Sequence, residues 1–490
     1  MQSEWLDPGQ APHAQELRAA AGGSLWAQHQ LGMYGSVVGQ LTEDVRRTSW
    51  RSLLAAAASS AALGRHAEAR HFVSELERHP LARWRHRRRV ATGLALHAPA
   101  LALHWLEQTH RRGEKDACLD VWVALLCGLQ RYGQAALALP QALHDCPEQP
   151  ELLLHQANLL RLGKLKSHPN TEEAAHASLT RYFERFGLEQ PHRIDTSQPF
   201  SARNATATAS PAQGARPLVS VIMTAHETAD RIESALRSLL AQTHQDLEIL
   251  VMDDASADDL GSVVTLLQQK DPRVSYFRLP RNVGTYVAKE LALRHLVRGD
   301  FVTCHDSDDW SHPRKIELQL DELLQQPERV FSWSYWLRLQ DDGLIVARQS
   351  HPLLRSNLSS VLFRRDPVLN RAGGYDQVRT GADSEFLARL QLVFGQKASA
   401  RVRKPLAFGA ARAGSLMTDQ VTGITGVTST TPFRLAYWEA WRRWHMESLK
   451  QGRRPRMPEK PLQRPFPIPE GQAAAPGPDL LEAIWRQVNG

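Results

Sequence analysis

The chain has 490 residues, of which 42% are hydrophobic and 23% are charged, and its formal net charge is +7. This composition is typical of a soluble globular protein and excludes a disordered or fibrous chain. The length exceeds the roughly 250–300 residues at which a single core stops growing, so two or more domains are expected. No run approaches the about 18 apolar residues of a membrane span. Because Met1–Trp5 lacks the pattern of a secretion signal, we expect a cytoplasmic protein.

Cysteines and basic residues indicate no dedicated cofactor or nucleic-acid module. The cysteines lie at positions 118, 127, 146 and 304 without metal-site spacing, which is typical of buried thiols. Basic residues form short clusters such as Arg85–Arg89 and Arg453–Arg456, which are usually solvated faces. We therefore expect no nucleic-acid binding. A basic surface still favours anionic partners such as sugar nucleotides, and peripheral contact with phospholipid headgroups stays an open alternative.

Residues 10–189 consist almost entirely of helix formers, with Ala and Leu at helical spacing, and predict an all-helical domain. A weak repeat of small residues recurs near positions 64, 98, 133 and 163, close to the about 34-residue period of tetratricopeptide helix pairs. The region therefore resembles tetratricopeptide repeats, with an irregular helical bundle as the alternative. Repeats of this kind present a surface to protein partners.

Residues 190–216 are small, polar and interrupted by prolines, which predicts a linker. Residues 217–449 then alternate strand and helix patterns, which predicts an α/β domain with a parallel sheet. The strands are expected at 218–224, 247–252, 274–279 and 301–304, and the helices at 230–241, 260–269 and 286–297. Residues 450–490 are rich in proline and predict an extended arm that ends in a short helix at 480–488.

Polar residues follow several of the predicted strands. They are Thr224–Glu227, Asp253–Ser256, Arg281–Gly284 with Lys289 in the next helix, and Asp306–Asp309. In open α/β sheets, ligands bind beyond the carboxyl ends of the strands, so these groups are expected to share one cleft. Each group taken alone is also compatible with a helix cap, because Asp and Ser are common at helix starts.

Asp306 and Asp308 are the candidate metal ligands. Side chains of an extended chain alternate with period 2, so both carboxylates can point at one hard cation such as Mg²⁺ or Mn²⁺. Asp309 is expected to cap the helix that follows. The alternative for the whole segment is a solvated acidic turn.

Taken together, these motifs resemble those of the family 2 glycosyltransferases, whose nucleotide-diphospho-sugar-binding domain has the GT-A fold. The resemblance covers about residues 217–415. The matching segments are 219–226, 238–243, 251–256, 281–284, 306–309, 373–376 and 381–386. It implies an α/β GT-A domain behind the helical-repeat domain, a nucleotide-diphospho-sugar donor (most often a UDP-sugar), Mn²⁺ or Mg²⁺ as cofactor, and a carbohydrate or glycoconjugate acceptor.

The resemblance also implies roles for individual residues. Asp383 matches the catalytic base, with Glu385 as the alternate base, and Asp308 matches the carboxylate that binds the metal. The residues implied to contact the nucleotide sugar are Thr224, His226, Glu227, Asp253, Asp254, Asn282, Lys289, Asp306 and Arg412. Three positions depart from the family pattern: His226 replaces an aromatic residue, Lys289 replaces an arginine, and Ala382 replaces a glutamate.

The chemistry supports this interpretation independently of the resemblance. Displacement of a nucleoside diphosphate puts negative charge on the leaving phosphate, which a divalent cation stabilises. The attacking hydroxyl must lose a proton on the opposite face of the sugar, so a carboxylate is needed away from the metal. Asp383 suits this task, and its alternative role is a plain helix cap.

Two aromatic clusters have a structural and a functional interpretation. Phe331, Trp333, Tyr335 and Trp336 predict a strand that belongs to the core, with stacking on an acceptor sugar as the alternative. The segment that contains Trp438, Trp441 and Trp444 predicts a helix packed on the catalytic domain, with an interfacial membrane anchor as the alternative.

The sequence thus predicts an inverting, metal-dependent glycosyltransferase that acts in surface polysaccharide or glycoconjugate synthesis. A scaffold protein with an inactive GT-A domain is one alternative, supported by Ala382 and Lys289. A nucleotidyltransferase is another, but it would want a Gly-rich phosphate loop after the first strand, and Thr224–Thr228 contains no glycine.

Overall fold

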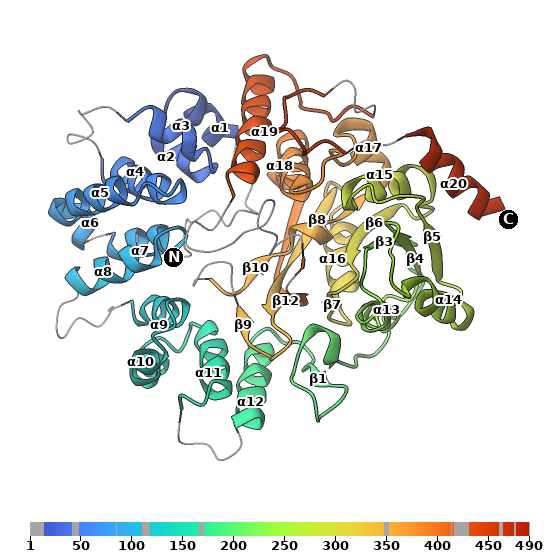
Figure 1. The fold of residues 1–490 in the computed structure, drawn as a ribbon, viewed down its shortest axis with the longest axis horizontal. Coiled ribbons are helices and arrows are strands. Elements are labelled where there is room, and N and C mark those ends of the chain that lie inside the picture. The colour runs from blue at the N-terminus through green and yellow to red at the C-terminus, as the bar shows by residue number, and fades with distance from the viewer. Residues whose placement is uncertain are drawn as a thin grey trace.

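The computed structural model describes residues 14–41, 49–84, 86–109, 118–165, 171–346, 352–412, 414–415, 431–459, 464–474 and 477–489. It contains an arc of helices followed by a mixed sheet with helices on both faces (Figure 1). The predicted fold class, an all-helical region before an α/β domain, is confirmed.

The N-terminal arc consists of successive helix pairs. Short helices α1 (Ala14–Ala21), α2 (Leu25–Gln30) and α3 (Tyr34–Gly39) open it, and α6 (Pro80–Trp84) follows the first pair. The pairs are α4 (Trp50–Ala62) with α5 (His66–Arg78), α7 (Arg87–Ala95) with α8 (Pro99–Thr109), α9 (Leu119–Gly128) with α10 (Tyr132–Asp145), and α11 (Glu151–Arg161) with α12 (Thr171–Glu184). The order of pairs agrees with the repeat spacing, while assignment to tetratricopeptide repeats stays a prediction.

Small residues explain the repeat pattern in physical terms. Gly64 and Gly163 follow the ends of α4 and α11 with φ of 76° and 64°, the left-handed conformation that glycine adopts at a helix end without steric cost. Ala55, Ala57 and Ala61 in α4 are fully buried, which lets neighbouring helices approach closely. The small residues at positions 64 and 163 of the repeat therefore mark helix ends.

The α/β half is built on a ten-stranded mixed sheet whose main path runs β5-β4-β3-β6-β11-β8-β12-β7, with β9 (Ile345–Val346) and β10 (Arg355–Ser356) both paired to β8. The parallel part comprises β3 (Val219–Ala225), β4 (Leu247–Asp253), β5 (Val274–Arg278) and β6 (Phe301–Asp306). The antiparallel β11 (Leu362–Arg364) joins it to β8 (Phe331–Leu339), which lies parallel to β12 (Ser399–Ala410), and β7 (Trp310–Ser311) ends the path.

Two apolar clusters cover the two faces of this sheet. Because side chains alternate along a strand, Val221 and Met223 of β3 enter one cluster and Ile222 enters the other. The first cluster contains residues of α13 (Ile232–Leu240), α14 (Leu260–Lys270) and α16 (Lys315–Gln325). The second contains residues of α15 (Thr285–His295), α17 (Arg365–Arg371), α18 (Ala382–Phe394) and α19 (Pro432–Lys450).

Residues 190–216, predicted to form a linker, are packed in the structure. β1 (His192–Arg193) pairs with β2 (Ala205–Thr206), and Phe200 is fully buried. Phe200 belongs to a cluster that also contains Phe183 of α12 and Phe408 of β12. This segment therefore fixes the last helix pair on the sheet instead of tethering it loosely.

The first helices of the arc contact the opposite end of the α/β half. Leu17, Leu31 and Met33 pack with Met446 of α19, and the backbone N–H of Gly35 donates to the Glu439 carboxylate at 2.6 Å. Both ends of the arc thus contact the α/β half, as Figure 1 shows.

The aromatic helix and strand mostly serve the core. Trp441 of α19 is 1% exposed, and Trp438 and Trp444 pack against the same cluster, which confirms the predicted packing of this helix. In β8, Phe331 and Trp333 are buried. Among the described residues, no helix combines the length and the apolar character needed to cross a membrane.

Candidate active site

The parallel strands bring the predicted polar residues to one edge of the sheet. The register places Thr224 beside Asp306 and Ala225 beside Asp253. The carboxyl ends of β3, β4 and β6 therefore lie side by side, as the strand-end argument requires.

Lys289 of α15 links the acidic motif to the predicted base. Its side chain is 2% exposed, and its ammonium lies 3.4 Å from Asp306 Oδ1. Burial alone would lower the pKa of Lys289, but the negative charges of Asp306 and Asp383 hold it above its usual value. Lys289 is thus within electrostatic reach of both carboxylates.

Asp383 lies at the start of α18, with its side chain partly exposed. Its Oδ1 accepts the backbone N–H of Ser384 at 2.8 Å. The preceding Gly381 has φ of 85°, a left-handed conformation that lets the chain turn into the helix. Ala382 is fully buried in the apolar cluster, so the position that departs from the family pattern faces the core.

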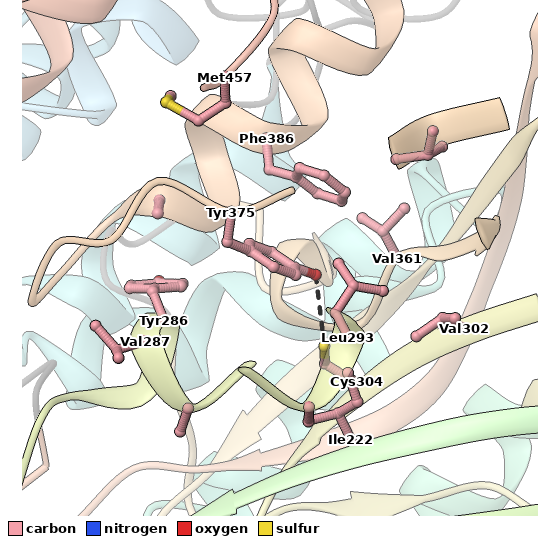
Figure 2. Close-up of a cluster of buried hydrophobic side chains, with 14 of the residues drawn as sticks. Ile222, Tyr286, Val287, Leu293, Val302, Cys304, Val361, Tyr375, Phe386 and Met457 are labelled. Carbon is pink, nitrogen blue, oxygen red and sulfur yellow. Dashed lines mark hydrogen bonds between the residues drawn. The ribbon is translucent and has the colours of Figure 1, made fainter. Parts of the chain in front are cut away.

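Figure 2 shows part of the apolar cluster that contains Cys304 of β6 and Phe386 of α18. The Tyr375 hydroxyl points at Cys304 Sγ, and their atoms are 3.4 Å apart. The same cluster contains Tyr286, Tyr375 and Phe386. This cluster joins the end of β6, which bears Asp306, to the loop that leads to Asp383.

Asp308 and Asp309 differ in their surroundings. The Asp308 carboxylate accepts a hydrogen bond from Arg412 Nε at 2.8 Å. Asp309 was expected to cap a helix, but this prediction is wrong, because its carboxylate accepts the backbone N–H of Ala410 in β12 at 2.9 Å. Burial, reinforced by Asp308 and Asp306, raises the pKa of Asp309 well above its usual range.

Asp254 organises the loop predicted to contact the nucleotide. Its two oxygens accept the backbone N–H groups of Val283 and Gly284 at 2.7 and 2.8 Å. Asn282, next to this pair, is exposed and accepts a hydrogen bond from Arg379 at 3.3 Å. Asp254 therefore ties the end of β4 to the start of α15.

Asp253 has a structural role inside the protein. Its side chain is fully buried. One oxygen accepts the Ser256 backbone N–H at 2.8 Å, and the other accepts the Tyr276 hydroxyl at 2.6 Å. Both oxygens are engaged inside the protein, so Asp253 orders the loop after β4, while its contact with a nucleotide stays a prediction.

Thr224, His226 and Glu227 lie together at the end of β3. The Thr224 hydroxyl is 2.7 Å from that of Thr285, which connects β3 to α15. His226 and Glu227 are exposed, and Glu227 has φ of 50° with its backbone N–H bonded to Ser256. The turn thus presents two polar side chains near Asp254. His226 is close enough to Asp254 to affect the pKa of its carboxyl group.

Glu385 is not an alternate base. Its side chain is fully buried and pairs with Arg389 at 2.8 Å and with His445 at 3.1 Å. Burial opposes the charge, but Arg389 and His445 lower the pKa of Glu385 to about 2. A carboxylate held in this way cannot reach an acceptor hydroxyl.

Sequence reasoning missed two cations near the acidic motif. Lys315 of α16 is 1% exposed, and burial lowers its pKa to about 8 despite the nearby Asp309. Arg231 donates to both oxygens of Asp341, at 3.0 and 2.5 Å, and Asp308 contributes to its raised pKa. No sequence motif marks either residue, and the Asp341 partner of Arg231 lies 110 positions further along the chain.

The donor atoms of Asp306 and Asp308 fit a hard divalent cation. Their side chains are 34% and 16% exposed, and each is paired with a cation, Asp306 with Lys289 and Asp308 with Arg412. In the described part of the chain, no group of three or more His, Cys, Asp or Glu side chains is arranged to hold a metal by itself. Mg²⁺ characteristically takes only one or two carboxylates and completes its shell with phosphate and water, which this pair allows.

The strands β3, β4 and β6 thus form an α/β domain with polar residues at their carboxyl ends. Residues 220–378 match the family model described as glycosyl transferase family 2, so the chain carries a domain of that family. Asp383 lies just beyond the matched segment.

Curated relatives agree with this family over part of their length. The chain is 33% identical over 136 residues to the putative teichuronic acid biosynthesis glycosyltransferase TuaG of Bacillus subtilis, a match that covers 28% of this chain and 53% of the relative. It is 29% identical over 150 residues to an uncharacterized glycosyltransferase of Rickettsia conorii, covering 31% of this chain and 24% of the relative. The chain thus spans less than two thirds of these relatives.

A solved structure is also similar in part. The crystal structure of S. aureus TarS residues 1–349 in complex with UDP-GlcNAc shares 18% identity with a TM-score of 0.34, and the match covers 40% of this chain and 60% of that chain.

Proposed function

We propose that this protein is an inverting, metal-dependent glycosyltransferase that moves a sugar from a nucleotide-diphospho-sugar, a UDP-sugar, to a hydroxyl acceptor. The observation that carries the proposal is the position of Asp306 at the polar edge of the sheet, 3.4 Å from Lys289, whose pKa both Asp306 and Asp383 raise. A pair of carboxylates for the metal and a separate, partly exposed carboxylate for the base are the two functions that the reaction needs.

In the proposed reaction, Asp383 accepts the proton of the acceptor hydroxyl. The hydroxyl oxygen bonds to the sugar carbon from the face opposite the diphosphate, the bond from that carbon to the phosphate oxygen breaks, and the configuration inverts. Asp306 and Asp308 would hold Mn²⁺ or Mg²⁺, which when bound supplies positive charge to the leaving diphosphate. Arg412, which pairs with Asp308, is placed to add a second positive charge.

The setting in surface polysaccharide or glycoconjugate synthesis rests on the relatives. TuaG, the Bacillus subtilis relative, is named for teichuronic acid biosynthesis. The structure adds that the helical half contacts the α/β half at both ends, which suits a role for that half in acceptor or partner binding.

The test is transfer from a panel of nucleotide sugars with Mn²⁺, comparing wild-type protein with Asp383→Asn and Asp366→Asn. Asp366 is a matched control, because its side chain is 70% exposed and belongs to α17, away from the acidic motif. We expect Asp383→Asn to lower kcat by about 10²–10⁴-fold, the usual contribution of a general base, while Asp366→Asn retains wild-type kcat.

Two results would contradict the proposal in different ways. Undiminished transfer by Asp383→Asn would remove the assigned base. Wild-type protein that transfers no sugar from any donor would favour the alternative of a helical scaffold with an inactive GT-A domain.

A further inference from the structure

The described part of the C-terminal arm, residues 453–459 and 464–474, packs along the loop that leads to the predicted base. The loop, residues 372–381, leads directly into α18 and Asp383. The arm lies beyond residues 220–378, the segment that matches the family model. Its contacts with the loop therefore come from outside the matched segment.

The first contact fixes the beginning of the loop. The backbone N–H of Met457 donates to the Ala372 carbonyl at 2.9 Å, and the Met457 side chain is 4% exposed in the apolar cluster. Gly373 lies so close that a Cβ added there would be 2.3 Å from the Met457 carbonyl oxygen. The loop and the arm are thus in direct backbone contact at this point.

The second contact is a buried charge pair. Asp376 is 2% exposed at its side chain, and its carboxylate accepts hydrogen bonds from Arg464 of the arm and, at 2.9 Å, from Tyr437 of α19. Burial raises the pKa of Asp376, while Arg464 opposes that shift. A buried carboxylate needs such partners, so Arg464 holds Asp376 in place.

The third contact continues to the residue before Gly381. Gln472 is fully buried, its side-chain amide donates to the Thr380 carbonyl at 2.6 Å, and its backbone carbonyl accepts from Arg379 at 3.0 Å. Ala473 forms an antiparallel bridge with Val378. The arm therefore adds a short strand-like edge to the loop, three residues from Asp383.

We propose that the arm is a positioning element of the active site, in which Arg464 and Gln472 hold residues 376–381 so that Asp383 faces the acceptor hydroxyl. This inference rests on the proposed function of Asp383. Neither residue touches the reacting atoms, and both act through the loop. An error of about 1 Å in the placement of a catalytic group is enough to cost roughly 10²-fold in rate.

The test compares Gln472→Glu with Gln487→Glu. Gln472→Glu keeps the side-chain shape but replaces the amide donor that binds the Thr380 carbonyl with an acceptor. Gln487, in α20 (Pro478–Asn489), also bonds through its side-chain amide to a backbone carbonyl, that of Arg278, but is exposed, so its variant is a control for the chemical change alone. Arg464→Met and Arg464→Lys form a second pair, in which lysine restores the charge.

Two measurements are made on each variant of the full chain: hydrogen exchange of the backbone amides in residues 376–384, and kcat and KM for donor and acceptor. We expect Gln472→Glu and Arg464→Met to speed exchange in this segment and lower kcat by about 10–100-fold with an unchanged donor KM. Arg464→Lys should recover part of kcat, and Gln487→Glu should leave both measurements at wild-type values.

Unchanged exchange and kcat in Gln472→Glu and Arg464→Met would overturn the inference. An equal loss of kcat in Gln487→Glu would also overturn it, because the arm would then act through general stability. If wild-type protein transfers no sugar, the proposed function fails, and the exchange data still decide whether the arm holds the loop.

Discussion

Replacement of Arg389 by methionine tests how the loop before Asp383 is held from within the core. Arg389 is fully buried in α18 and donates to both oxygens of Glu385, at 2.8 and 2.9 Å. The same guanidinium donates to the carbonyls of Ala372, Gly373 and Gly374, the last two at 3.1 and 2.7 Å. Methionine keeps the apolar stem of the side chain and removes every one of these donors.

The structure sets the size of the effect. Removal of one partner from a buried ion pair leaves an uncompensated charge and costs about 3–5 kcal/mol. The orphaned backbone carbonyls each add an unsatisfied acceptor, which places the loss toward the upper end of that range. For a domain of this size, a loss of about 5 kcal/mol lowers Tm by roughly 10–20 °C.

Thermal unfolding of wild-type protein, Arg389→Met and Arg486→Met measures this loss. Arg486 pairs with Glu482 at the same four-residue spacing on α20, but these side chains are 77% and 65% exposed, so we expect its variant to change Tm by less than about 2 °C. The double variant Glu385→Gln/Arg389→Met should regain several degrees, because it no longer buries a carboxylate that has lost its arginine partner. An Arg389→Met protein with wild-type Tm, or a double variant no more stable than the single one, would refute the reasoning.

Three further outcomes follow from the same contacts. The pKa of Glu385 is lowered to about 2 in the folded protein, so its ionised form stabilises the protein above about pH 4.5, and that stability is lost as pH falls toward 2. The Tm difference between wild type and Glu385→Gln in unfolding scans should therefore shrink over this pH range. A constant Tm difference would contradict the prediction. Lys289→Met should lower kcat by at least about 10-fold, because Asp306 and Asp383 lose a buried cation that interacts with both. Lys289→Arg is the charge-preserving control, and unchanged kcat in both variants would be the contrary result. Chelation should abolish transfer and added Mn²⁺ should restore it, whereas transfer that persists in excess chelator would exclude the metal.

The sequence predicted the sheet and its polar edge because these depend on local patterns. Alternating apolar residues and the polar groups that end them locate β3, β4 and β6 to within about two residues. Such patterns could not predict the different roles of Asp253 and Asp254. Both residues lie at the end of the same strand. Asp253 bonds to Tyr276, and Asp254 bonds to the Val283 and Gly284 amides, all more than twenty positions further along the chain.

Glu385 shows where helical geometry could have corrected the prediction. In an α-helix, residues two positions apart are separated by about 200° around the axis, so Glu385 cannot share the face of Asp383. Arg389, four positions later, lies on the same face as Glu385 and completes a buried pair. The helical period and the i,i+4 arginine were therefore a readable signal against Glu385 as a base.

Amino-acid composition alone did not predict how the linker and the arm pack against the rest of the protein. Small, polar and proline-rich segments are usually extended, and this much was predicted. Their docking depends on single residues, such as Phe200 in one segment and Gln472 in the other, whose burial is decided by surfaces elsewhere in the fold. The bonds from Gln472 to Thr380 span 92 positions, and no local pattern contains that information.

The way the last helix pair is attached argues that the helical half belongs to the working unit. The Asn158 side chain of α11 donates to the Ile345 carbonyl at 2.6 Å and accepts the Ile345 N–H at 2.8 Å, so it pairs with β9 as a neighbouring strand would. The turn between β8 and β9 carries Asp341, which pairs with Arg231 in the neighbourhood of Asp308. A helix of the arc thus supports the same hairpin that reaches the acidic motif. Any molecule bound by the helical half is consequently held at a fixed place relative to that motif, which a flexible tether would not provide.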